Sequence, residues 1–122
     1  MSKEEDLILD AINYAKAHGF NIIRQATFDR TQNPICCNAL GAILIKLGKD
    51  NMVDTSYDPQ WIKLICAYLD KDMLWMFKFV QGFSYGNCLS FTYMDNGKEK
   101  TEHDDVSKWA NKLALKNCDK NV

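Results

Sequence analysis

A chain of 122 residues is about one domain long and can bury a single core without the help of disulfides or metal ions. Its 47% of hydrophobic and 25% of charged residues are ordinary globular values, which argue against a disordered chain. The net charge of -1 removes the whole-protein electrostatic case for a nucleic-acid partner, since proteins that bind phosphate backbones are usually basic.

The N-terminus and the cysteines indicate a reduced, cytoplasmic protein. The first residues lack the basic and apolar segments of a secretory signal. Five cysteines are an odd number, so they do not complete a disulfide framework. The longest mainly apolar run, residues 73–80, is too short to cross a membrane, so no membrane partner is predicted. We expect a single domain over residues 1–122, frayed at residues 1–2 and 117–122.

The first helix is predicted over residues 3–17. Ser2 and Glu5 match a capping box, and apolar residues follow at helical spacing. Gly19 can adopt the positive φ that often ends a helix. The mixed pattern of residues 20–32 predicts a loop packed over the core.

The second helix is predicted to begin at Asn33, because asparagine is a common N-cap and Pro34 suits the first helical position. This places Cys36 and Cys37 in the first turn. The helix has little polar surface, which indicates that neighbours surround it, and Gly48 ends it.

Two further helices are predicted before a loop rich in glycine. Asp58 followed by Pro59 is a start signal for the third helix, and Asp72 caps the fourth. The fourth helix is apolar nearly all round, so we expect it at the centre of the fold. Gly82 is its expected end.

A hairpin is predicted next, because residues 89–94 alternate between apolar and polar side chains and Asn96-Gly97 is a strong turn signal. The return strand, residues 98–102, is wholly polar. A small exposed hairpin and a single strand with a mobile partner therefore both fit the sequence.

Asp104 or Asp105 caps a last helix, whose apolar residues follow the helical period closely. The expected fold class is mainly α: a compact bundle of about five helices with a small β-hairpin between helices four and five.

Three segments, CCNALGAI, LWMFKFVQGF and VSKWANKLA, together resemble a group of small uncharacterised bacterial proteins. In that group, a Cys-Cys pair opens a Leu-Gly-Ala helix, and a tryptophan helix that ends in Phe-x-x-Gly-Phe follows. This chain departs from the pattern at Asn38, which separates the cysteine pair from Ala-Leu-Gly, and at Ser84, where the group has an acidic residue. The resemblance implies no activity, because none is known for the group.

The cysteine pair carries one catalytic hypothesis. The positive end of a helix dipole favours a thiolate, so a helix start would lower the pKa of Cys36 or Cys37, and His103 is the candidate base. Core packing is the favoured interpretation, because Cys36 shares a stripe with apolar residues and a buried cysteine is an inert hydrophobe. No catalytic residue is therefore favoured.

No metal or cofactor is predicted. A disulfide between adjacent cysteines needs a strained ring that a helix does not hold, and a metal site prefers separated ligands such as Cys-x-x-Cys, which this sequence lacks.

The residues between helix four and the hairpin are the binding candidates. Phe83, Tyr85, Gly86 and Asn87 form an aromatic segment flanked by glycines, and binding residues are common on such loops. The alternative is that these aromatic side chains belong to the densest part of the core.

The expected function is that of a small cytoplasmic, non-catalytic binding or adaptor protein, whose partner is a protein or a small molecule. The alternative is a small thiol-dependent enzyme with Cys36 or Cys37 as nucleophile and His103 as base. A third expectation is a homo-oligomer in which the apolar central helices form part of the interface.

Overall fold

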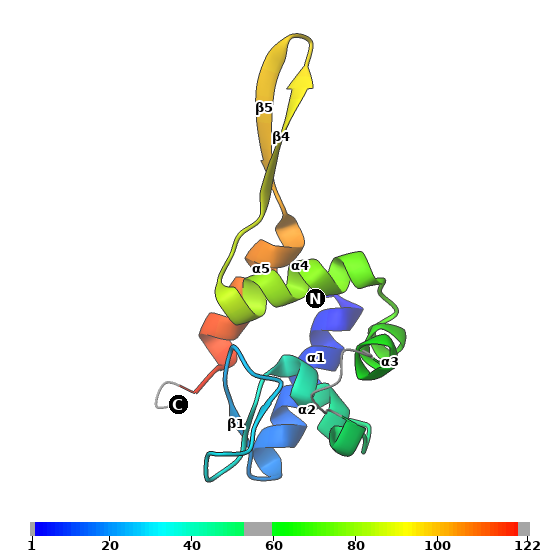
Figure 1. Ribbon diagram of the computed structural model, residues 1–122, viewed down its shortest axis with the longest axis vertical. Coiled ribbons are helices and arrows are strands. Elements are labelled where there is room, and N and C mark those ends of the chain that lie inside the picture. Colours follow the sequence, from blue (N-terminus) through cyan, green and yellow to red (C-terminus); the bar gives the residue numbers. More distant parts are fainter. Residues whose placement is uncertain (1, 53–59, 120–122) are drawn as a thin grey trace.

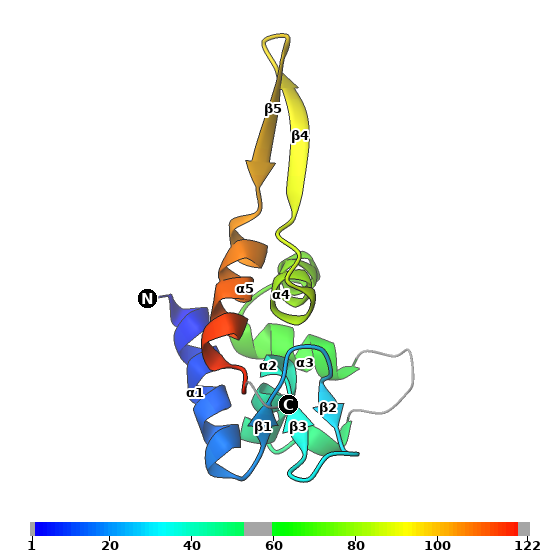
Figure 2. The same ribbon diagram turned by 90° about the vertical axis from the view of Figure 1, so that its left-hand side faces the viewer.

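The computed structural model describes residues 2–52 and 60–119. Helices form a body at one end of the molecule, and a long β-hairpin projects from it (Figures 1 and 2). The described helices are α1 (Lys3–Ala17), α2 (Ala39–Lys46), α3 (Gln60–Leu69), α4 (Met73–Tyr85) and α5 (Asp105–Asn117), with a short 3-10 turn η1 (Asp50–Met52). The described strands are β1 (Asn21–Ile22), β2 (Phe28–Asp29), β3 (Cys36–Cys37), β4 (Ser90–Asp95) and β5 (Lys98–His103). Five helices and a hairpin between the fourth and fifth are thus confirmed within these ranges.

Helix α1 forms where the sequence predicts it. The Ser2 side chain accepts a hydrogen bond from the Glu5 backbone N–H at 3.2 Å, and Gly19 follows the helix with a φ of +87°. Its buried face packs against α2 and consists of Ile8, Ala11, Ile12 and Ala15.

A small three-stranded sheet lies between α1 and α2 in the sequence. Two of its strands fall in the predicted loop of residues 20–32, and the third falls in the predicted second helix. The strand order is β1-β3-β2, with β3 parallel to β1 and antiparallel to β2. Cys36 and Cys37 are therefore the central strand and not the first turn of a helix. The prediction fails because both flanking segments supply backbone partners, which satisfy the cysteine N–H and C=O groups without a helix.

Helix α2 begins at Ala39, five residues after Pro34, the residue predicted for its first helical position. The cap is Asn38 and not Asn33: its side-chain oxygen accepts hydrogen bonds from the N–H groups of Leu40 at 3.0 Å and Gly41 at 3.1 Å. The Asn33-Pro34 peptide is cis and lies ahead of β3. The expected burial of the helix is confirmed, since residues 39–44 are all buried.

Helix α4 differs from its prediction at its end and in its position. Asp72 caps it as expected, accepting from the Trp75 N–H at 2.8 Å. The helix passes through Gly82, whose missing side chain lets the Ser107 backbone of α5 approach, and ends at Gly86 in the left-handed conformation. The start signal of the preceding helix, Asp58-Pro59, lies outside the described residues.

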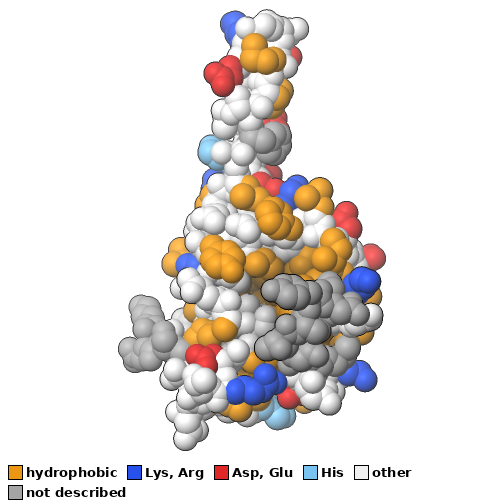
Figure 3. Space-filling view, viewed as in Figure 1, with side chains coloured by type: hydrophobic (Ala, Val, Ile, Leu, Met, Phe, Trp, Pro, Cys, Tyr) orange, Lys and Arg blue, Asp and Glu red, His pale blue; other side chains and the backbone are white. Residues whose placement is uncertain are grey.

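Helix α4 covers one side of the body and is not central. Met76, Phe79 and Phe83 are buried beneath it, but Leu74 and Phe77 on its outer face are 61% and 54% exposed. Figure 3 shows hydrophobic side chains gathered over α4 on this outer face. Helices α4 and α5 pack closely against each other.

The two strands of the hairpin are paired over residues 90–103, and the chain turns at Asn96-Gly97, where both residues have positive φ. We call residues 90–103 the arm. The body holds its base, because the Leu89 N–H donates to Ser107 Oγ at 2.9 Å and the Asp104 N–H donates to the Leu89 carbonyl at 2.7 Å.

The C-terminal helix and the residues after it are anchored at both ends. Asp104 caps α5 and forms an ion pair with Lys78 at 3.1 Å. Asp119 then pairs with the free side of β1: its N–H donates to the Ile22 carbonyl at 2.8 Å, and its carboxylate accepts from the Ile22 N–H at 2.7 Å. Asp119 is therefore bound to β1, and residues 120–122 of the segment predicted to fray lie outside the described residues.

Candidate binding site

The cysteine pair is buried, and both thiols have a raised pKa. The pKa of the Cys37 thiol is raised to about 12, mainly by burial and to a smaller extent by the neighbouring Cys36. Burial also raises the pKa of Cys36, with further contributions from the carboxylates of Asp29 and Asp119. Both groups are neutral thiols at physiological pH, which is opposite to what a nucleophile requires.

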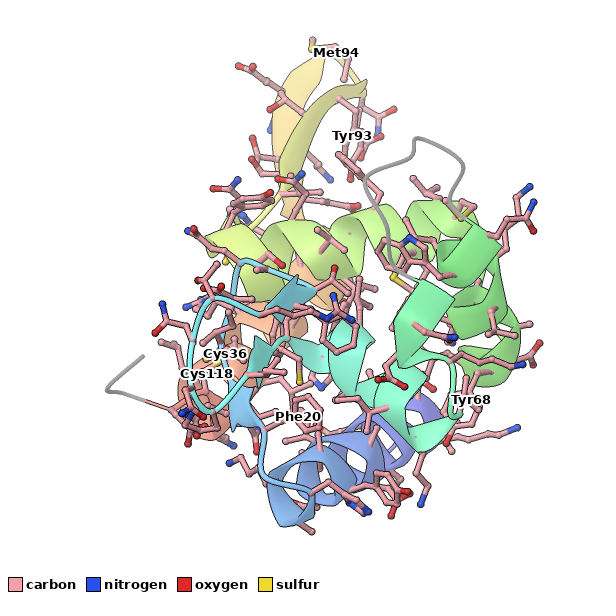
Figure 4. All side chains as sticks on the ribbon, turned by 60° about the horizontal axis from the view of Figure 1, so that its bottom comes forward. Phe20, Cys36, Tyr68, Tyr93, Met94 and Cys118 are labelled. Carbon is pink, nitrogen blue, oxygen red and sulfur yellow. The ribbon has the colours of Figure 1, made fainter. Side chains whose placement is uncertain are left out.

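His103 is far from the cysteines in the fold. It is exposed at the end of β5, on the arm side of α4, whereas β3 lies on the other side of that helix (Figures 1 and 2). Figure 4 shows the same separation between Cys36, near the sheet, and Tyr93 and Met94, on the arm. The structure does not bring the proposed nucleophile and base together.

The predicted aromatic loop is mostly the last turn of α4. Phe83 is buried in the core, and Tyr85 is 57% exposed on the surface. Gly86 is the helix C-cap, and the Asn87 side chain donates to that of Gln81 at 3.0 Å. These four residues therefore do not converge on one pocket.

Arg24, which the sequence did not single out, holds the same end of α4. Its guanidinium donates to the carbonyls of Phe83 at 2.8 Å and Gly82 at 2.9 Å, and to Asn111 Oδ1 at 2.6 Å. A cation at a helix C-terminus is stabilised by the helix dipole. Arg24 therefore ties the segment after β1 to α4 and α5.

A groove with polar and aromatic walls lies where the N-terminal ends of α1 and α5 meet α4. It has a volume of about 210 Å³. We call it the tryptophan groove, and its lining residues are Ser2, Glu4, Trp75, Asp105, Val106 and Trp109.

Two indole rings form the apolar wall of the tryptophan groove. The ring centroids of Trp75 and Trp109 are 6.1 Å apart, and the ring planes are tilted by 50°. Phe79 supports both rings from the core, at 5.4 Å from Trp75 and 5.8 Å from Trp109. The Trp109 indole N–H is fixed by Glu5 Oε1 at 2.9 Å.

The polar wall of the groove is acidic. Glu4 and Asp105 line it, and Lys71 lies at its edge, with its ammonium 3.5 Å from Glu4 Oε1 and 5.8 Å from the Trp75 ring centroid. A cation within about 6 Å of an indole centroid is attracted by the face of the ring. At the edge of the groove, the Lys71 ammonium is therefore bound by the Glu4 carboxylate and the Trp75 indole.

Within residues 2–52 and 60–119, no cluster of three or more histidine, cysteine, aspartate or glutamate residues is placed to hold a metal ion. Among the same residues, no helix has both the length and the hydropathy needed to cross a membrane. Comparison of the chain with known protein families, with curated proteins and with solved structures finds no match.

Proposed function

We propose that the protein is a small cytoplasmic, non-catalytic binding protein, and that it binds a protein partner by taking a lysine or arginine side chain into the tryptophan groove. The position of the Lys71 ammonium between Glu4 and Trp75 is the observation that carries this proposal.

The size of the groove favours a single side chain over a free small molecule. Its volume of about 210 Å³ is below the roughly 300–1,000 Å³ of ordinary small-molecule pockets. A long aliphatic stem can lie along the wall that Trp75 and Trp109 form while its charged head meets the carboxylates of Glu4 and Asp105.

The thiol-dependent enzyme is the weaker proposal. It requires an ionised cysteine next to a base, whereas Cys36 and Cys37 are buried as neutral thiols and His103 is at the end of β5.

The proposal is tested by titrating the protein with short blocked peptides that carry one central lysine, arginine or norleucine. The Trp61→Phe variant is used, so that fluorescence comes from Trp75 and Trp109 alone. We expect the lysine and arginine peptides to change this emission saturably, with an affinity in the millimolar range, and the norleucine peptide to have no effect.

Charge variants identify the polar wall. We expect Glu4→Gln and Asp105→Asn to weaken lysine-peptide binding several-fold, because each removes a carboxylate that lines the groove. Asp6→Asn is the matched control, since Asp6 is an exposed acidic residue in the first turn of α1 that does not line the groove. Equal binding of the norleucine peptide, or equal loss in all three variants, would overturn the proposal.

A further inference from the structure

The described side chains of the arm are exposed along most of its length. Every residue of β5 is exposed, and on β4 Tyr93 is 38% and Met94 68% exposed. The arm extends away from the helices in both views (Figures 1 and 2). A two-stranded hairpin is only marginally stable in water, and its free edges are templates for another strand.

The two edges of the arm differ in how readily they accept a strand. Strand β5 reads KEKTEH, and its alternating charges would lose hydration if a strand covered them. Strand β4 reads SFTYMD, whose one charged residue, Asp95, is at the tip. The edge of β4 is therefore the one that another strand can cover without burying charge.

The register within the arm determines which positions face this edge. Asp95 and Lys98 are paired on either side of the two-residue turn, and in such a hairpin they exchange backbone hydrogen bonds with each other. Because the direction alternates along an antiparallel strand, the backbone groups of Ser90, Thr92 and Met94 point to the free edge of β4.

These positions are self-complementary. If two β4 strands pair antiparallel about a twofold axis, Thr92 lies opposite Thr92 of the second copy, and Ser90 lies opposite Met94. We call the contact between the two β4 strands the β4 seam. It contains no like-charge pair, and it partly covers Met94. The two bodies lie at opposite ends of the joined arms, because each arm projects from its body.

We propose that the protein forms a twofold dimer in which the β4 strands of two copies pair with Thr92 on the axis, giving a four-stranded antiparallel sheet. An interface related by a twofold axis uses the same patch on both copies, which is the commonest arrangement among soluble oligomers. The second copy is favoured over another protein because two β4 edges can pair in this register without placing like charges opposite each other.

A disulfide across the axis tests the register. Thr92→Cys is made in a Cys88→Ser, Cys118→Ser background, which removes the exposed and the half-buried native thiols. Opposite residues of a hydrogen-bonded pair have Cα atoms about 5.5 Å apart, within the range that a disulfide spans. We expect diamide to convert Thr92→Cys rapidly to a covalent dimer by oxidising two thiols to a disulfide.

Thr101→Cys in the same background is the matched control. Thr101 is the cross-strand partner of Thr92, is exposed like it, and lies on the other strand of the arm. It should cross-link several-fold more slowly than Thr92→Cys. Equal or faster cross-linking of Thr101→Cys would overturn the β4 seam.

Sedimentation velocity over a concentration series tests the dimer without cross-linking. We expect the unmodified protein to shift from monomer to dimer as its concentration rises. Thr92→Lys should abolish the shift, because it places two like charges opposite each other on the axis, and Thr101→Lys should preserve it. A monomer at all concentrations would overturn the proposal, whether or not the tryptophan groove binds its peptide.

Discussion

Cys37 is the residue whose chemistry burial changes most clearly. Its pKa is raised from the ordinary 9.0 to about 12, first by burial and then by the neighbouring Cys36. In the unfolded chain the thiol ionises near its ordinary value, so between these two values the unfolded state holds fewer protons than the folded state. The contribution of this thiol to stability is complete below pH 9.0 and is lost as the pH rises towards 12.

We therefore expect the free energy of unfolding to fall above pH 9.0, with Cys37 contributing up to about 1.4 kcal/mol per pH unit. Urea unfolding at a series of alkaline pH values measures this slope. Cys37→Ala should make the slope shallower, and Cys88→Ala, at an exposed cysteine, should leave it unchanged. A slope that is the same in Cys37→Ala and in the unaltered protein would contradict a buried neutral thiol.

Two asparagines show where a residue-level prediction succeeds and where it fails. Asn33 and Asn38 are both suitable N-caps, and the proline after Asn33 makes it the stronger signal locally. The structure uses Asn38, because residues 36–37 pair with β1 and β2 before the helix begins. Those partners are distant in the sequence, so local signals contain no information about which asparagine is the cap.

At the scale of the element, the outer face of α4 should tolerate charge. Leu74→Lys and Phe77→Lys change side chains that are 61% and 54% exposed, so each should alter the free energy of unfolding by at most about 0.5 kcal/mol. Phe79→Ala, which empties a position that is 1% exposed, should cost about 3–5 kcal/mol.

Urea unfolding of the three α4 variants distinguishes this arrangement from the central helix that the sequence predicts. A loss of several kcal/mol in Leu74→Lys would place that side chain in the core and contradict the exposed face. The hydrophobic pattern of α4 could not settle the matter, because apolar residues in every direction are compatible with burial by neighbours and with an exposed apolar face.

Elements that depend on contacts between residues close in the sequence are predicted, and those that depend on remote contacts are missed. Ser2 and Asp72 cap helices as the sequence predicts, and Asp104 is the cap among the two candidates for the last helix. Each accepts a hydrogen bond from an N–H only two or three residues away. The strands of two residues are missed, because their signal is too short and their partners are remote. The tryptophan groove is missed for the same reason, since it exists only when α1, α4 and α5 are packed together.

The whole molecule consists of a helical body and an arm that meet at a narrow base. At this base, a backbone hydrogen bond joins the segment that enters the arm to the segment that leaves it: the Asp104 N–H donates to the Leu89 carbonyl at 2.7 Å. A short Gly-Asn-Gly turn can therefore replace residues 90–103 without moving α4 or α5. Shortening a loop costs little or even stabilises the fold, since closure entropy changes only slowly with length.

We expect the armless variant to unfold with a free energy within about 1 kcal/mol of that of the full chain, because none of the described side chains of the arm is buried. Its circular dichroism should retain the helical signal. None of the residues that line the tryptophan groove belongs to the arm, so the lysine peptide should bind with unchanged affinity, while self-association is lost. If peptide binding were lost together with self-association, the groove and the arm would be one functional surface; if neither were lost, the arm would not be the interface. Because the body holds the groove and the arm holds the free strand edge, this one variant separates the two proposed interactions.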